Sequence, residues 1–325
     1  SDERAAVHLA LARQMMVGTA EEVNQRSVVI ASHLGEALGL LVDGEERLRA
    51  AGVLLIAGTR AKTTMATAAA ASFLENGLSL LPNDAWDRHY ELTLALHTEA
   101  ADVAYIDQRF DDVERYAPAV VTHARSNLDR VPIHTIKIGV GVSRRAYREA
   151  TVYAVDVLAS DFGVRLPRDP TTAHVLKGVA QVKLALRRHT TEDLLRLPPM
   201  TDPEITAVMG ILMKTATNAY WATPNLVPLI AFEMCRLSVQ HGNIGLSAYG
   251  YALYGMVASA ALGQLDLGYA YGRLAMDLLD ATGDTHLVGK TALLWHGFIR
   301  HVKDPLRECG PDILEAYDVA PVSYT

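Results

Sequence analysis

The sequence predicts an all-α fold built from repeated helix-turn-helix units, and three observations lead to this expectation. Half of the residues are hydrophobic but only 6% are aromatic, a mix that favours many small helix contacts over one large aromatic core. Apolar residues recur at steps of three and four over long stretches. Related segments also return at a spacing in the upper thirties, which is typical of right-handed α-solenoids of tetratricopeptide-like repeats.

The first clear helix pair is predicted over 50–62 and 66–80. Its opening, GVLLIAGTRAKTTM from residue 52, could also be the strand, glycine turn and lysine of a phosphate-binding loop. Such a loop needs one glycine directly before the lysine and another five residues earlier, because bare backbone N–H groups wrap the phosphates. Ala61, directly before Lys62, and Ile56 occupy those positions. We therefore predict helix here and no nucleotide site.

Internal repetition defines the middle of the chain. QRFDDVERYAPAV (108–120) and RRAYREATVYAVDV (144–157) each place an aromatic residue at a turn, followed by an acidic residue and small or branched residues. Phe110 and Tyr147 are 37 residues apart, and the segment 263–278 follows the same plan. We expect both aromatics to be buried at their turns, so that truncation to alanine costs about 3–5 kcal/mol.

The stretch 134–142 can be read in two ways. Ile136, Ile138 and Val140 alternate with small or polar residues, which is the period of a strand. In the repeat frame the same stretch is the first helix of a pair, and Ile138 and Gly141 stand where two helices approach closely. The repetition favours helix.

Helix ends are predicted from capping residues. A capping side chain directly before a proline indicates a helix start, and a glycine after an apolar run indicates a stop. The stretch 197–203, LPPMTDP, is the expected irregular joint of the array. The predicted starts are Asp169-Pro170, Asp202-Pro203 and Thr223-Pro224, and the predicted stops lie in QHGN (240–243) and ATGD (281–284).

Composition limits the partners. The formal net charge is −7 and no basic run is present, so nucleic-acid binding is not expected. No apolar stretch approaches the ~18 residues of a membrane span. Cys235 and Cys309 lie far apart and outside any CxxC pattern, which indicates a reducing cytoplasm. Cys235 falls within an apolar helical stripe and is predicted to be a small buried hydrophobic residue.

No catalytic residue, cofactor site or metal site is predicted. His89, Glu91, His97 and Glu99 do not follow the spacing of three or four that lets ligands share a helix face. GVGVSR (139–144) lacks the third glycine of a dinucleotide loop. The stretch around Ser247, GLSAY, likewise lacks the second glycine of a nucleophile elbow. For Tyr251 and Tyr254, which share a helix face, core packing is favoured over a ligand surface.

Five segments carry a resemblance to a known family. The chain resembles the central helical region of large bacterial multidomain signalling proteins, in which a predicted AAA-like ATPase, often preceded by a serine/threonine kinase domain, is followed by tetratricopeptide-like helices. A GAF sensor and a histidine kinase or nucleotide cyclase come after them. The matching stretches are ASHLGEAL (31–38), 43–78, LSLLPNDAWDRHYELTLALHTEAADVAY (78–105), LPPMTDPEITAVMGILM (197–213) and RLSVQHGNIGLSAYGYALYGM (236–256).

The resemblance implies a non-catalytic interaction and sensing module, a single helical-repeat domain over 1–325 cut from a longer chain. Its partners would be a protein or peptide, including adjacent ATPase or kinase domains of the same chain, or a small-molecule effector. Two alternatives remain open: a fragment with its own nucleotide or hydrolytic site, and a module that pairs chains into oligomers.

A partner-binding face can be placed within the repeat frame. The first helix of each pair lines the concave side of such solenoids, which is their usual recognition surface. In one repeat this face carries Thr98, Asp102 and Tyr105, and in the preceding repeat it carries Thr59 and Lys62. Core packing does not require polar groups on these alanine-rich helices, so we predict a peptide-binding role, with ordinary solvation as the alternative.

Overall fold

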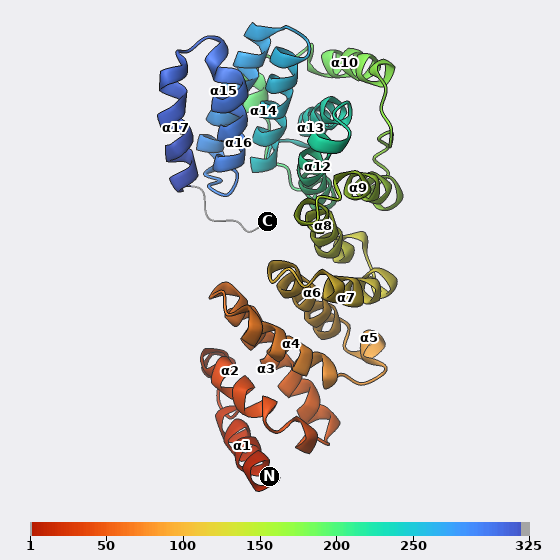
Figure 1. Ribbon diagram of the computed structural model, residues 1–325, viewed down its shortest axis with the longest axis vertical. Helices are drawn as coiled ribbons and strands as arrows, with labels where there is room; N and C mark the ends of the chain where they lie inside the picture. Colours follow the sequence, from red (N-terminus) through yellow and green to blue (C-terminus); the bar gives the residue numbers. More distant parts are fainter. Residues whose placement is uncertain (1, 320–325) are drawn as a thin grey trace. The chain divides into compact units, whose positions relative to one another are not determined.

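The computed structural model describes residues 2–319, and all regular elements in this range are helices (Figure 1). One isolated bridge between Pro199 and Asn243 is the only β pairing in the described residues. The predicted all-α class is therefore confirmed. Contacts divide the chain into two compact units, Ser1–Ile136 and Lys137–Thr325.

The two units differ in how far the packing of their helices keeps to the order of the chain. In the first unit the longer helices pack in chain order, α1 on α2, α2 on α3, α3 on α4, α4 on α6 and α6 on α7, and α3 also packs on α6, the first helix of the following pair. The first unit contains α1 (Asp2–Met15), α2 (Ala20–Gly35), the 3-10 helix η1 (Leu38–Leu40), α3 (Gly44–Thr63), α4 (Thr67–Ser79), α5 (Ala85–Arg88), α6 (Tyr90–Ile106) and α7 (Phe110–His123).

The second unit is larger. Helix α8 (Asn127–Ser143) begins before the boundary and ends after it. Beyond it lie α9 (Tyr147–Phe162), α10 (Thr172–Leu186), α11 (Thr191–Leu195), α12 (Pro203–Ala222), α13 (Leu226–His241), α14 (Gly245–Ala260), α15 (Leu265–Thr282), α16 (Val288–Leu294), the π-helical turn η2 (Trp295–Ile299), the 3-10 turn η3 (Arg300–Val302) and α17 (Leu306–Val319).

The helix pairs α3–α4, α6–α7 and α8–α9 are each connected by a turn of the same type. In each turn a single residue takes the left-handed conformation, and the second helix begins two residues later. The residues are Met65 (φ 60°), Gln108 (φ 58°) and Arg145 (φ 57°). The next backbone N–H donates to the carbonyl five residues before it, which satisfies the end of the first helix. These bonds are Ala66 to Ala61 (2.9 Å), Arg109 to Ala104 (2.8 Å) and Ala146 to Gly141 (2.8 Å).

Because the turns match, Phe110 and Tyr147 stand at equivalent positions, as their spacing predicts. The stretch 134–142 lies within α8, so helix is the correct interpretation. Gly141 marks the close approach of two helices, since a Cβ there would collide with that of Ala150. The predicted pair at 50–62 and 66–80 corresponds to α3 and α4.

The prediction that Phe110 and Tyr147 are buried is wrong. Both are the first residues of their helices and are only half-buried. The aromatic residue that enters the core stands eight positions after the left-handed residue. Tyr116 occupies that place in α7 and Phe73 in α4, and Tyr271 does so in α15 after Gly263 (φ 65°). Their exposed fractions are 5%, 8% and 5%.

The array is interrupted between α9 and α12. These two helices pack directly on each other, while α10 packs on α13 and α11 packs on α15. The irregular joint predicted at 197–203 is present, because no helix covers 197–202. It is the last part of a longer interruption that also includes α10 and α11.

The interruption ends at a tight junction with the α13–α14 turn. The Asn243 backbone N–H donates to the Pro198 carbonyl at 2.8 Å, and the Met200 N–H donates to the Asn243 carbonyl at 2.8 Å. Gly242 has φ 96°, and a Cβ at this position would also collide with the Pro198 carbonyl. The predicted stop in QHGN is therefore confirmed, with glycine required for two independent reasons.

Two of the three predicted helix starts need correction. Asp202 caps α12 as expected, and its carboxylate accepts from the N–H groups of Glu204 and Ile205. Thr171 rather than Asp169 precedes α10, and Asn225 rather than Thr223 precedes α13. In both cases the proline stands in the turn before the helix instead of at its first position. The stop in ATGD is confirmed by Gly283 (φ 66°) after α15.

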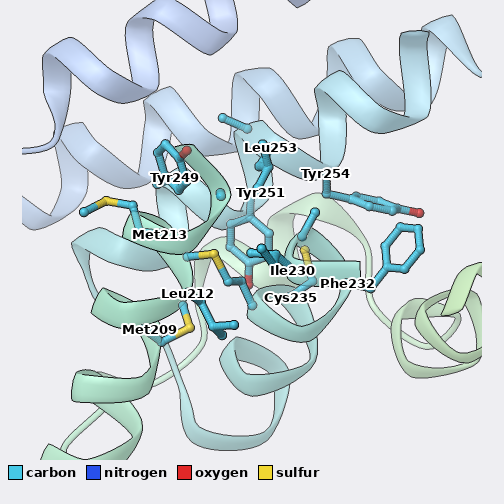
Figure 2. Close-up of a cluster of buried hydrophobic side chains, with 14 of the residues drawn as sticks. Met209, Leu212, Met213, Ile230, Phe232, Cys235, Tyr249, Tyr251, Leu253 and Tyr254 are labelled. Carbon is cyan, nitrogen blue, oxygen red and sulfur yellow. The ribbon is translucent and has the colours of Figure 1, made fainter. Parts of the chain in front are cut away.

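The second unit has a core rich in tyrosine and sulfur (Figure 2). Tyr251 and Tyr254 are 0% and 2% exposed, so core packing is the correct interpretation of this pair. Cys235 is completely buried, as predicted, and burial raises the pKa of its thiol. The ring of Tyr254 meets that of Tyr271 edge-on at a centroid distance of 4.7 Å, a favoured aromatic geometry.

Candidate functional site

An ion cluster joins α3 to α6 in the first unit. Lys62 Nζ lies 2.6 Å from Glu99 Oε2 and 2.8 Å from Asp102 Oδ2. The three side chains are 18%, 25% and 28% exposed, respectively. This partial shielding from water makes their mutual attraction stronger than that of a fully exposed pair.

The packing of α3 on α6 explains why these side chains meet. Glu99 and Asp102 are three residues apart on α6 and therefore share a face. Lys62 and Tyr105 both stand three positions before the left-handed residue of their turn, and Thr59 and Asp102 both stand six positions before it. Because α3 packs on α6, Lys62 comes within reach of Asp102, which stands one helical turn before the position that matches its own, and of Glu99 about one turn earlier still.

The five residues predicted for the partner face have different surroundings. Lys62 and Asp102 are joined directly. Thr59 is half-buried and its hydroxyl donates to the Leu55 carbonyl of its own helix at 3.0 Å. Tyr105 is only 9% exposed, so most of its ring packs inside the unit. Thr98 is half-buried on α6.

The charge of Lys62 is stabilised by its two partners. Burial alone lowers the pKa of the ammonium, but hydrogen bonds and charge from Asp102 and Glu99 outweigh this and raise the pKa of Lys62 above its usual range. The cluster therefore holds one cation between two carboxylate side chains. Glu99 enters the sequence-based predictions only as a rejected metal ligand. Its spacing of three from Asp102 is the signal that could have revealed this role.

A stack of three rings joins α5, α6 and α7. The Trp86 ring is sandwiched between His97, at a centroid distance of 5.2 Å, and His123, at 4.9 Å. His97 Nδ1 is buried and has no hydrogen-bond partner among the described residues. Burial, and then the nearby His123, lowers the pKa of His97 to about 4. The folded protein therefore holds His97 neutral at neutral pH.

This stack predicts an acid-sensitive first unit. The pKa of His97 is lower when folded than when unfolded, where it is about 6.5, so the unfolded chain binds the extra proton first. Stability contributed by neutral His97 is present above about pH 6.5 and is lost as the pH falls towards 4. We expect a loss of about 2 kcal/mol, allowing for partial exposure of the ring. Urea unfolding at several pH values measures this loss of stability.

The variant His97→Phe is the matched control, because it keeps an aromatic ring beside Trp86 and removes the titrating group. Its stability should vary less between pH 6.5 and 4 than that of the wild type, by about the same 2 kcal/mol. Equal pH dependence in the two proteins would contradict the assignment.

The other candidate stretches of the sequence lie within helices or at their turns. GVGVSR (139–144) lies mostly in α8 and its end forms the turn before α9. Ser247 is fully buried in α14, where its hydroxyl oxygen accepts from Ser238 at 2.8 Å and from the Ile244 N–H at 3.1 Å. Within residues 2–319, no group of three or more His, Cys, Asp or Glu side chains could hold a metal ion.

A pocket of about 620 Å³ lies among α1, α2 and α3. Its apolar wall includes Met16, Val23 and Val53. At its polar end, Arg13 binds Glu46 through two hydrogen bonds of 2.6 and 2.8 Å. Four charged residues line this pocket, two arginines and two acids, so their charges balance. The pocket therefore has no charge preference for a ligand.

Comparison with known proteins gives no match to a family model, a curated protein or a solved structure. Among the described helices, none is both long and apolar enough to cross a membrane.

Proposed function

We propose that this chain is a non-catalytic interaction module, a right-handed solenoid of tetratricopeptide-like repeats that binds a protein segment on the shared face of α3 and α6. The observation that carries the proposal is the common turn of three helix pairs. It sets the polar residues of consecutive first helices in one register, and in such solenoids the first helices form the recognition surface.

The charges of this face favour a basic segment. Lys62 neutralises one of the two carboxylates of Glu99 and Asp102, which leaves one net negative charge. A carboxylate can accept about four hydrogen bonds, so both acids retain acceptor sites beside the Lys62 ammonium. A lysine or arginine of a partner can donate to those sites. The small exposed part of Tyr105 lies on the same helix.

The resemblance of the sequence to bacterial multidomain signalling proteins suggests where that segment comes from. In that arrangement the module stands beside a predicted ATPase or kinase domain, so the proposed partner is a basic surface segment of the neighbouring domain in the longer chain. The module would then report a bound protein or effector to the ATPase in a cytoplasmic signalling protein.

Binding between this chain and its neighbouring domains, produced as separate polypeptides, tests the proposal. We expect Asp102→Arg and Tyr105→Ala each to weaken the affinity about tenfold, because the first reverses a charge of the proposed face and the second removes the small exposed part of a mostly buried ring. Glu91→Arg, on an exposed position of α6, makes the same charge change as Asp102→Arg and should leave the affinity unchanged. If both test variants stay within twofold of the wild type in calorimetry, the proposed surface is wrong.

A charge swap separates binding from folding. In Lys62→Asp/Asp102→Lys an ion pair still joins α3 and α6, so the melting temperature should stay closer to the wild-type value than in Asp102→Arg alone. The position of the carboxylate nevertheless changes, and the affinity should remain low. Recovery of full affinity in the double variant would mean that Asp102 acts only through folding.

The enzymatic alternative has its own readout in the same calorimeter. Titration with Mg-ATP should give no saturable heat, because Lys62, the lysine of the phosphate-loop-like stretch, is held by Glu99 and Asp102 near the end of a continuous helix. Saturable binding of Mg-ATP would favour the nucleotide-binding alternative.

A further inference from the structure

A second, smaller pocket of about 280 Å³ lies in the second unit, within the interruption of the array. The left-handed Gly163 (φ 69°) ends α9, and the chain then runs without helix to α10. This non-helical segment, α10 and α13 form the walls. The lining residues are Arg165, Leu166, Pro167, His174, Lys177, Gly178, Gln181, Val182, Leu229, Phe232, Glu233 and Arg236.

The pocket carries an excess of positive charge. Arg236 is neutralised by Glu233, since its Nε donates to Glu233 Oε2 at 2.9 Å and a second nitrogen donates to the other oxygen. Arg165 and Lys177 line the pocket and are exposed, and neither forms an ion pair with any described residue. Two uncompensated cations thus line one small pocket in a chain whose net charge is −7. Such a local reversal of sign attracts anions.

His174 adds a directed hydrogen-bond donor. Its Nδ1 accepts from the Thr171 backbone N–H at 3.2 Å at the start of α10. When Nδ1 of a neutral imidazole accepts, the proton is on Nε2. The ring can therefore donate from Nε2, in addition to the donors of Arg165 and Lys177.

The floor of the pocket is apolar. Leu229 and Phe232 of α13 are 9% and 5% exposed and reach α10 at Gly178. A Cβ at Gly178 would lie 2.8 Å from Phe232 Cδ2 and 2.9 Å from Leu229 Cδ2. The missing side chain lets the two helices come together here and leaves an apolar surface below the cations.

We propose that this pocket binds a phosphate monoester that carries a compact apolar group. A phosphate monoester has close to two negative charges at neutral pH, which matches the two uncompensated cations Arg165 and Lys177. Its apolar group would lie on Leu229 and Phe232, and His174 would donate to a phosphate oxygen. An apolar wall with a few convergent polar groups is the usual composition of a small-molecule site.

Phenyl phosphate is a suitable probe, and its binding can be followed by phosphorus NMR titration at low ionic strength. We expect saturable binding that weakens as salt is added, because the attraction is screened. Inorganic phosphate should bind about tenfold more weakly, since it lacks the apolar group. Equal affinity for the two probes, or no saturation by phenyl phosphate, would overturn the proposal.

Charge reversal at the mouth locates the bound probe. Arg165→Glu and Lys177→Glu should each weaken phenyl phosphate about tenfold, and both sites are exposed, so folding is preserved. Arg188→Glu is the matched control, because Arg188 is also exposed but does not line the pocket. If the control weakens binding as much as the two test variants do, the probe is held only by non-specific attraction to surface cations, and the assigned site is wrong.

Discussion

Truncation of Tyr271 to alanine should lower the free energy of unfolding of the second unit by about 3–5 kcal/mol, the range measured for buried aromatic residues. Tyr271 is 5% exposed and contacts the rings of Tyr254 and Tyr251 at centroid distances of 4.7 and 6.1 Å. The same truncation at Phe110 should cost only about 1–2 kcal/mol in the first unit, because half-burial removes less apolar surface from water. Urea unfolding measures both losses.

This comparison tests the revised repeat register. In this register the aromatic residue eight positions after the left-handed turn residue contributes most to stability. The aromatic residue at the start of the second helix contributes less. Tyr220→Ala serves as the control, since Tyr220 is 48% exposed, and it should change stability by less than about 1 kcal/mol. Equal losses at Phe110 and Tyr271 would contradict the register.

Replacement of Asn243 by alanine should cost the second unit about 3 kcal/mol. The side chain is 6% exposed. Its Nδ2 donates to the Leu194 carbonyl at 2.6 Å, and its Oδ1 accepts from the Tyr251 hydroxyl at 3.1 Å. Removal leaves two buried polar groups without partners, and each costs about 1–3 kcal/mol.

A double-mutant cycle with Tyr251→Phe shows whether the two residues act together. Tyr251→Phe alone should cost about 1 kcal/mol, since the ring stays in place and only the hydroxyl is lost. In the double variant the losses should be less than additive, because one hydrogen bond cannot be lost twice. Strict additivity would mean that Asn243 stabilises the unit without Tyr251. Asn83→Ala, at an exposed position, is the neutral control.

Those features of the fold that depend on local chemistry could be predicted from the sequence. The helix pair at 50–62 and 66–80, the Asp202 cap and the glycine at 283 each depend on residues within one or two turns. The ambiguous stretch 134–142 required more, because its strand-like alternation is as strong as its helical pattern. The recurrence of related segments elsewhere in the chain favours helix there, which is correct.

Features that depend on distant packing were missed. The segments of α10 and α11 have ordinary helical periodicity. Nothing in their local sequence shows that they pack on α13 and α15 rather than on their neighbours in the chain. Burial of Phe110 was overestimated for a related reason. An aromatic residue beside a turn looks like an anchor, but only the packing between helices decides which of two nearby rings enters the core.

The candidate site was predictable only in part. Repeat alignment placed Lys62 and Asp102 on neighbouring first helices, and the structure brings them within hydrogen-bond distance. It could not show that Glu99 completes the cluster or that Tyr105 is mostly buried, because both depend on the exact rotation of α6 against α3. The pocket beside α10 was not anticipated, since its residues come from segments far apart in the chain.

The interruption of the array also has a consequence for the order of folding. Pairs such as α14 and α15 join neighbouring segments and can form early, whereas α10 and α11 dock on α13 and α15, which lie further along the chain. Closure of long loops is slow, so these two helices should dock late. The elements that dock last are commonly the first to open locally. A ligand held between α10 and α13 would bind the closed arrangement only, and its binding energy would shift that equilibrium towards the closed state.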